Sequence, residues 1–134
     1  MTAQLSRALV AAELPILERH GLTMWAYVVL ANLGTEPTSS QAALADAIRA
    51  DRTRIIGVLD DLQERGLITR EPDPADRRVR LISLTAKGRR LRDATRRDIQ
   101  RNEQRLLSVL PAGEQATFLR LVERLADAAP DAFA

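Results

Sequence analysis

The sequence contains no cysteine and only one histidine, His20. Without cysteine, the chain can form no disulfide and offers no thiolate to a substrate or a metal. A zinc site needs three or four nitrogen or sulfur ligands, which a chain with one histidine and no cysteine lacks. Any Ser-His catalytic pair would have to use His20. The six glycines form no phosphate-binding motif. We therefore expect no enzyme, no metal and no other cofactor.

Long apolar runs are also missing, and no charged-then-apolar leader follows Met1. A membrane-spanning helix needs about 20 consecutive apolar residues. We therefore expect a soluble, cytoplasmic protein with no membrane partner. Its 134 residues, 46% of them hydrophobic, are enough for a single domain with a packed core.

Lysine is nearly absent, because 19 of the 20 basic residues are arginine and only Lys87 is not. The planar guanidinium suits phosphates and guanine edges, although a GC-rich genome would produce the same preference for arginine. Residues 49–105 carry 16 basic and 10 acidic residues, net +6, whereas the rest of the chain is net −4. Genome composition does not explain this segregation of charge.

Residues 70–84 predict a β-ribbon with a basic tip. Short apolar strands at residues 67–70 and 79–84 flank a connection that contains Pro72 and Pro74. Neither proline can donate a ladder hydrogen bond, so both are expected outside the paired part. The tip carries four charged residues, Asp73, Asp76, Arg77 and Arg78.

The helix expected before this ribbon begins at an N-cap, Asp51. Helical spacing predicts one buried face, made of Ile55, Val58, Leu59 and Leu62. At about 100° per residue, the opposite face presents Thr53 and Gly57. The flanks and first turn then carry Arg52, Arg54 and Ile56.

Two features of this helix favour contact with DNA. Its first half is neutral or cationic, and its acidic residues Asp60, Asp61 and Glu64 lie in the second half. This polarity suits a helix whose N-terminus enters a phosphate-lined groove, because the positive end approaches the phosphates and the acidic residues stay away from them. Gly57 costs roughly 1 kcal/mol relative to alanine in a helix. Close approach to a groove wall or tight packing against another helix would each explain it. The carboxylate pair of Asp60 and Asp61 is most simply interpreted as solvating charge on an exposed helix face.

The remaining elements are expected to be helices. Ser40 can cap a helix to about residue 49, and an amphipathic stripe predicts a first helix over residues 3–20 that Pro15 kinks or restarts. His20 ends that stripe before Gly21, a C′ candidate. His20 is interpreted as a partly buried structural residue, and the alternative is a pH-sensing or ligand-contacting role.

Thr23 can cap an almost wholly apolar helix over residues 24–33. We expect this helix, with Trp25 and Tyr27, to pack in the core; a shared role in lining a ligand cavity is the alternative, and the two are not exclusive. Thr85 can cap a long helix to about residue 109. Apart from Ala94 and Ile99 it is polar nearly all round over residues 92–105, which is typical of a connector that bridges solvent between two packed ends.

A last helix over residues 113–128 is predicted to bury four apolar side chains, Phe118, Leu121, Val122 and Leu125. They are far in sequence from the ribbon. We expect them to pack against the first helix and a second copy of the chain, which makes a homodimer.

Several motifs together resemble the MarR-type (multiple-antibiotic-resistance regulator) winged-helix transcription factors. They are Gly-Leu-Thr at residues 21–23, Ser-Gln-Ala-Ala-Leu-Ala at 40–45 and Leu-Gln-Glu-Arg-Gly-Leu-Ile-Thr-Arg at 62–70. The most specific are Asp-Pro-Ala-Asp-Arg-Arg at 73–78 and Leu-Thr-Ala-Lys-Gly at 84–88. The resemblance implies a mostly α fold, a winged helix-turn-helix with a two-stranded β wing and N- and C-terminal dimerisation helices. Residues 1–134 would form a single domain, with residues 23–90 as the DNA-binding part and 1–20 and 91–134 as dimerisation helices.

The resemblance further implies a dimer that binds a pseudo-palindromic site in double-stranded promoter DNA, usually as a repressor. The minor-groove contact would come from Arg78, held by Asp76, and favours A·T-rich flanks. The implied DNA-binding residues are Ser40, Gln41, Arg52, Thr53, Arg54, Gly57, Asp76, Arg77 and Arg78.

A small aromatic or anionic effector commonly binds members of this family between the dimerisation and DNA-binding parts. In this chain, the cleft would involve His20, Met24, Trp25 and Tyr27. The thiol-based and zinc-based sensing of some members does not fit a chain with no cysteine and one histidine. The alternative function is a winged-helix dimer that serves as a protein-interaction module without specific DNA binding.

Overall fold

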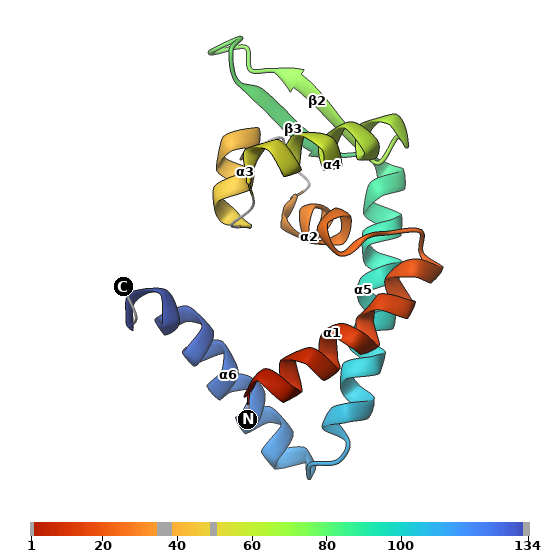
Figure 1. Cartoon of the computed structure of the whole chain (residues 1–134), viewed down its shortest axis with the longest axis vertical. Helices are drawn as coiled ribbons and strands as arrows, with labels where there is room; N and C mark the ends of the chain where they lie inside the picture. Colours follow the sequence, from red (N-terminus) through yellow and green to blue (C-terminus); the bar gives the residue numbers. More distant parts are fainter. Residues whose placement is uncertain (1, 35–38, 49–50, 133–134) are drawn as a thin grey trace. The chain divides into compact units, whose positions relative to one another are not determined.

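The computed structural model describes residues 2–34, 39–48 and 51–132, which are mostly helical (Figure 1). The chain forms two compact units, Met1–Ile99 and Gln100–Ala134, which are described separately below. No helix in the described ranges is long and apolar enough to cross a membrane. The elements in chain order are α1 (Thr2–Arg19), α2 (Met24–Asn32), β1 (Ser39–Ser40), α3 (Gln41–Ala47), α4 (Arg52–Glu64), β2 (Ile68–Pro72), β3 (Arg80–Leu84), α5 (Ala86–Leu107) and α6 (Ala112–Ala132).

Local signals set most helix ends. The Thr23 hydroxyl accepts from the Ala26 N–H at 3.1 Å, and the Asp51 carboxylate accepts from the Thr53 N–H at 3.0 Å. These two predicted N-caps are therefore confirmed. Gly21 and Gly66 have φ of 70° and 72°, the left-handed conformation of a C′ glycine. Helix α1 runs through Pro15 without a restart.

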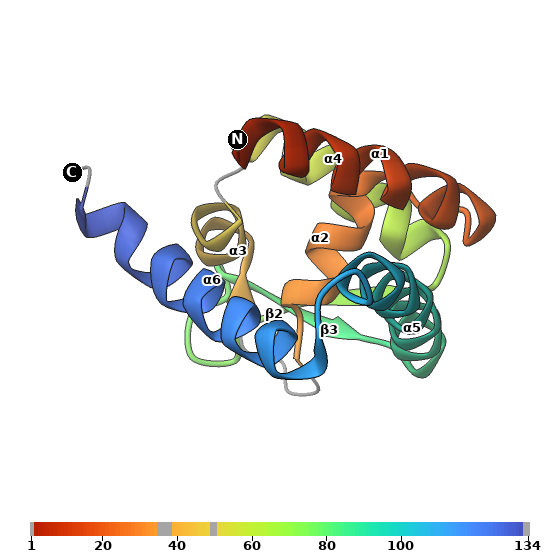
Figure 2. The same ribbon diagram turned by 90° about the horizontal axis from the view of Figure 1, so that it is seen from below.

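The core of the first unit forms around α2, which contacts α1, α3 and α4 (Figure 2). Its buried side chains come from the helices, both wing strands and the middle of α5. They include Leu17, Leu30, Leu44, Ile55, Leu59, Leu62, Ile68, Ile82 and Ile99. The helical repeat in α4 is therefore confirmed, with Val58 partly buried beside the core.

The predicted ribbon is an antiparallel pair of β2 and β3, which we call the wing together with its connecting residues 73–79. Its register runs from Ile68 opposite Leu84 to Pro72 opposite Arg80. Pro72 therefore lies inside the paired part, and the prediction that excluded it is wrong. The Asp73 N–H donates to the Val79 carbonyl at 2.8 Å. Hydrogen-bonded and non-hydrogen-bonded pairs alternate along an antiparallel ladder, so the neighbouring pair of Pro72 and Arg80 is a non-hydrogen-bonded one. Pro72 also lies on an edge strand, where no N–H is needed.

A third strand was not predicted. Residues 39–40 form β1, which pairs antiparallel with β3 and gives the strand order β1-β3-β2. Helix α3 begins directly after it at Gln41, as expected. The capping role predicted for the Ser40 side chain, and the predicted helix end at residue 49, lie outside the described residues.

The sequence Leu-Thr-Ala-Lys-Gly at residues 84–88 joins the start of α5 to the end of α4. The Thr85 hydroxyl accepts from the Gly88 N–H at 3.0 Å and donates to the Gly66 carbonyl at 2.7 Å. The Lys87 ammonium donates to the Arg65 carbonyl at 2.9 Å, a favourable place for a cation at a helix C-terminus. A Cβ on Gly88 would lie 1.9 Å from the Leu67 carbonyl oxygen, so only glycine fits. We call these contacts the α4–α5 seam.

Helix α5 is less exposed than its polar sequence predicted. Thr95 and Ile99 are buried, and the guanidinium of Arg92 donates to the Leu33 carbonyl at 2.9 Å. The prediction of a solvent-bridging connector is therefore wrong for residues 92–99. Thr95 can be buried there because its hydroxyl donates to the Leu91 carbonyl at 2.7 Å within the helix.

In the second unit, α6 extends past its predicted end at residue 128. Its apolar side chains are exposed within the single chain. Their burial against the first helix and a second copy of the chain stays a prediction. The exposed fractions are 37% for Phe118, 44% for Leu121, 43% for Val122 and 71% for Leu125. In the first unit, α1 likewise exposes Leu5, Val10 and Leu14.

Candidate nucleic-acid interface

The first half of α4 is an open surface. Thr53, Arg54 and Gly57 are exposed, while the side chain of Arg52 lies outside the described part of the chain. A Cβ on Gly57 would meet nothing within 4 Å among the described atoms. Packing of this glycine against another helix of the chain is therefore ruled out for the described residues. The other explanation, close approach to a bound molecule, stays a prediction.

The wing tip, which projects beyond α3 and α4, is organised by two carboxylates (Figure 1). The Asp73 carboxylate accepts from the Ala75 N–H at 2.9 Å, and the Asp76 carboxylate accepts from the Arg78 N–H at 3.1 Å. Each closes a turn between an aspartate and the backbone two residues later. The Val79 N–H then donates to the Asp76 carbonyl at 2.9 Å, which reverses the chain into β3.

Asp76 also orients the Arg78 side chain. The Nε of Arg78 donates to Oδ1 of Asp76 at 3.1 Å, and a terminal nitrogen donates to Oδ2 at 3.3 Å. These side-chain bonds, followed by the backbone bond from the Arg78 N–H, lower the pKa of Asp76 below its usual 3.8. The Arg78 side chain nevertheless remains 91% exposed. The tip therefore presents an oriented guanidinium to solvent.

Arg70 ties the wing to the two helices beside it, and sequence reasoning did not identify it. From β2, its guanidinium donates to Gln63 at 2.6 Å and Asp60 at 2.5 Å, both on α4, and to Gln41 on α3 at 3.2 Å. The interpretation of Asp60 as solvating charge is therefore wrong. No local pattern signals this network, because its members are up to 29 residues apart.

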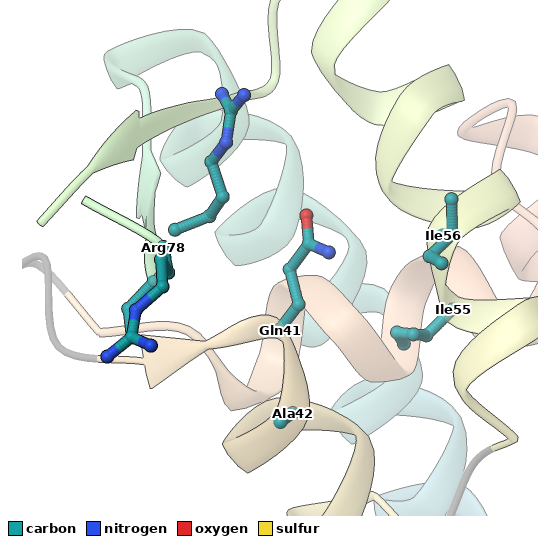
Figure 3. A pocket seen from close by; sticks show the side chains of 7 residues that line it. Gln41, Ala42, Ile55, Ile56 and Arg78 are labelled. Atoms are coloured by element: carbon teal, nitrogen blue, oxygen red, sulfur yellow. The ribbon is translucent and has the colours of Figure 1, made fainter. Parts of the chain in front are cut away.

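A hollow of about 280 Å³ lies between the starts of α3 and α4 and the base of the wing tip (Figure 3). Ala42, Ile55, Ile56 and Val79 give it apolar walls, and Gln41, Arg78 and Arg80 contribute polar groups. Two predicted DNA-binding residues, Gln41 and Arg78, thus line the same hollow as the exposed Ile56. Arg80, which lines it as well, was missed because it was counted only as a strand residue.

The predicted effector residues lie around α2. Met24 and Tyr27 are partly buried and pack against the core. The Arg54 guanidinium carbon lies 5.8 Å from the centre of the Trp25 ring, within the range of a cation–π contact. Arg54, which is predicted to contact DNA, therefore touches Trp25, which is predicted to contact an effector.

His20 joins the end of α1 to α5. Its Nε2 N–H donates to Oδ2 of Asp98 at 2.7 Å, and both side chains are partly buried. This contact supports the structural interpretation of His20. Asp98 was not singled out from the sequence, because it is 78 residues away and lies in a stretch interpreted as an exposed connector.

The sequence was compared with known families and proteins. The model described as "MarR family" matches residues 20–79. The transcriptional regulator HosA of Escherichia coli O111:H- is 32% identical over 107 residues, which cover 80% of this chain and 79% of HosA. A Thauera aromatica protein named as regulatory for the hcr operon is 33% identical over 105 residues, and the aligned part covers 78% of this chain and 63% of that protein.

The fold was compared with solved structures. CouR from Rhodococcus jostii RHA1 bound to p-coumaroyl-CoA matches with a TM-score of 0.81 and 29% identity, over 95% of this chain and 87% of that one. CouR bound to a 23-mer DNA duplex also matches with a TM-score of 0.81, at 26% identity, over 93% of this chain and 89% of that one. The likeness therefore extends over nearly the whole chain.

Proposed function

Because this chain belongs to the MarR family of winged helix-turn-helix transcriptional regulators, we propose that it binds promoter DNA as a homodimer and represses transcription until a small-molecule effector releases it. The observation that carries this proposal is the combination of an exposed α4 N-terminus with an oriented arginine at the wing tip. A helix and a wing arranged in this way can enter adjacent grooves of one duplex. CouR, whose fold is similar, is solved with a DNA duplex bound.

We assign the DNA contacts by element. The start of α4, with Arg52, Thr53, Arg54 and Gly57, faces the major groove. Arg78 enters the minor groove and Asp76 orients it, which favours the narrow groove of A·T-rich flanks. The remaining contacts, to the sugar-phosphate backbone, come from Ser40, Gln41 and Arg77.

The exposed apolar side chains of α1 and α6 support the homodimer. A face that leaves Phe118, Leu121, Val122 and Leu125 in contact with water is unfavourable for a lone chain, and burying it against a second copy removes that cost. Two-fold symmetry would also place two reading helices on a pseudo-palindromic site. In this proposal residues 1–20 and 91–134 supply the dimerisation helices.

For the effector we propose a site around His20, Met24, Trp25 and Tyr27. CouR binds p-coumaroyl-CoA, which carries both an aromatic ring and negative charge. An aromatic or anionic compound near Trp25 could compete for the Arg54 guanidinium, and this competition would connect effector binding to α4. Trp25 is the only tryptophan in the chain, so its fluorescence should report binding directly.

Selection of bound sequences from random duplex DNA, repeated at two salt concentrations, tests the proposal. We expect an enriched two-fold-symmetric site with half-sites about one helical turn apart. Salt-sensitive binding without enrichment would contradict sequence-specific regulation. Absence of binding by effector-free protein would favour the protein-interaction module.

A further inference from the structure

Ile56 is an exposed apolar residue on the helix assigned to the major groove. Ile56 is 45% exposed, whereas its neighbour Ile55 is 1% exposed and belongs to the core. Ile56 directly precedes Gly57, above which the surface is open. The protein's own packing therefore accounts for Ile55 but leaves much of Ile56 facing solvent.

Helical geometry places Ile56 on the side of α4 that faces the wing. Asp60 and Gln63 follow it by four and seven residues, so the three side chains form one stripe. Both later members bind Arg70 of β2. Ile56 begins this stripe and lines the hollow, in which Arg78 and Val79 come from the wing (Figure 3).

The two flanks of α4 therefore differ in chemistry. Arg54, on the other flank, lies against Trp25 and offers a cation. The wing-facing flank begins with an apolar side chain, and arginines of the wing line the same hollow. Those arginines favour an anionic partner, whereas Ile56 favours an apolar group carried by that partner. A DNA duplex that presents a methyl group satisfies both requirements.

We propose that Ile56 determines part of the DNA sequence specificity by contacting the 5-methyl group of a thymine in each half-site. The inference rests on the proposed function, because it requires α4 to lie in the major groove. The thymine methyl is the apolar group that base edges present there, and aliphatic side chains read it by contact. Gly57 contributes by allowing the backbone of α4 to approach the groove wall.

Replacement of thymidine by deoxyuridine tests this contact, because it removes only the methyl group. The selected duplex is prepared with deoxyuridine at one thymine position per half-site, each position in turn, and affinities are measured for wild type, Ile56→Ala and Ile56→Val. Circular dichroism and sedimentation verify that each variant is folded and has the same oligomeric state as wild type. Wild type should lose about fourfold in affinity per half-site at one position, the factor expected for burial of one methyl group.

Ile56→Ala should bind the thymine duplex more weakly and be insensitive to deoxyuridine at that same position. Ile56→Val, which keeps a branched apolar side chain, should remain sensitive. The inference is overturned if wild type is insensitive at every thymine, or if Ile56→Ala remains as sensitive as wild type. Weaker binding of Ile56→Ala without a change in methyl sensitivity would assign Ile56 to the sugar backbone and also overturn it. Failure of wild type to select any site would instead contradict the proposed function itself.

Discussion

Arg78 and Asp76 are two residues apart, and their contact lies at the tip of the wing, where the Arg78 side chain is 91% exposed. The carboxylate fixes both the Arg78 N–H and its guanidinium, so the side chain is oriented before any partner arrives. Such preorganisation reduces the entropy that the side chain loses on binding. In the proposed function, we therefore expect the pair to contribute to DNA recognition more than to folding.

Replacing Arg78 with alanine should weaken binding to the selected duplex by about tenfold while leaving the fold and the oligomeric state unchanged. The change removes one exposed groove contact and no core packing. Fluorescence anisotropy gives the affinity. Arg97→Ala, an exposed arginine on α5 away from the wing, is the matched control. Equal losses for both variants would show that general charge, rather than the wing, is responsible.

The Asp76–Arg78 contact also predicts a pH dependence. Because Arg78 stabilises the ionised carboxylate, the pKa of Asp76 lies below its usual 3.8. The order that this pair gives the wing is thus present above pH 3.8 and is lost as the pH falls through the lowered pKa. Carboxyl carbon NMR should give a midpoint below 3.8 for wild type and a midpoint nearer 3.8 for Arg78→Ala. Identical midpoints would exclude the contact in solution.

At the scale of elements, the α4–α5 seam fixes where the long helix starts. Gly88→Ala should destabilise the protein by about 3 kcal/mol, because the new Cβ would lie 1.9 Å from a backbone oxygen of Leu67 that cannot move aside freely. Urea denaturation at fixed protein concentration measures the change. Gly113→Ala is the control, since its Cβ would meet nothing within 4 Å among the described atoms and should change stability by less than about 1 kcal/mol. A similar loss of stability in Gly88→Ala and Gly113→Ala would contradict the close approach of Gly88 to Leu67 in the α4–α5 seam.

The Arg70 network connects the wing to α3 and α4. Arg70→Gln should lower stability by about 1 to 2 kcal/mol, because it removes charge-assisted hydrogen bonds to Asp60 and neighbouring amides. It should also lower DNA affinity, because the wing and α4 would no longer be held in one arrangement. Arg80→Gln, which leaves this network intact, serves as the stability control. Unchanged stability in Arg70→Gln would mean that the network does not form in solution.

Local signals made the elements predictable. Thr23, Asp51 and Thr85 act through backbone groups within three residues, and Gly66 acts through its own φ, so the sequence alone is sufficient to place them. Contacts between distant elements carry no such signal. The Arg70 network, the His20–Asp98 bond and the pairing of β1 depend on tertiary packing, and the position of Pro72 depends on strand register.

For the whole molecule, the proposed homodimer leads to the prediction with the largest expected effect. Leu121→Asp should dissociate the dimer and abolish operator binding, because it places a charge on the apolar face of α6. Sedimentation velocity measures the oligomeric state. Ala116→Asp introduces the same charge on the opposite face of α6 and should leave the dimer intact. A folded Leu121→Asp variant that still sediments as a dimer would place the interface elsewhere.

The central claim is that this chain reads a specific DNA sequence. Its most direct test compares the affinity of the purified protein for the selected duplex and for a scrambled duplex of the same composition, at two salt concentrations. We predict binding to the selected duplex that is at least about a thousandfold tighter, with both affinities falling as salt rises. Equal affinities for the two duplexes at both salt concentrations would contradict this account.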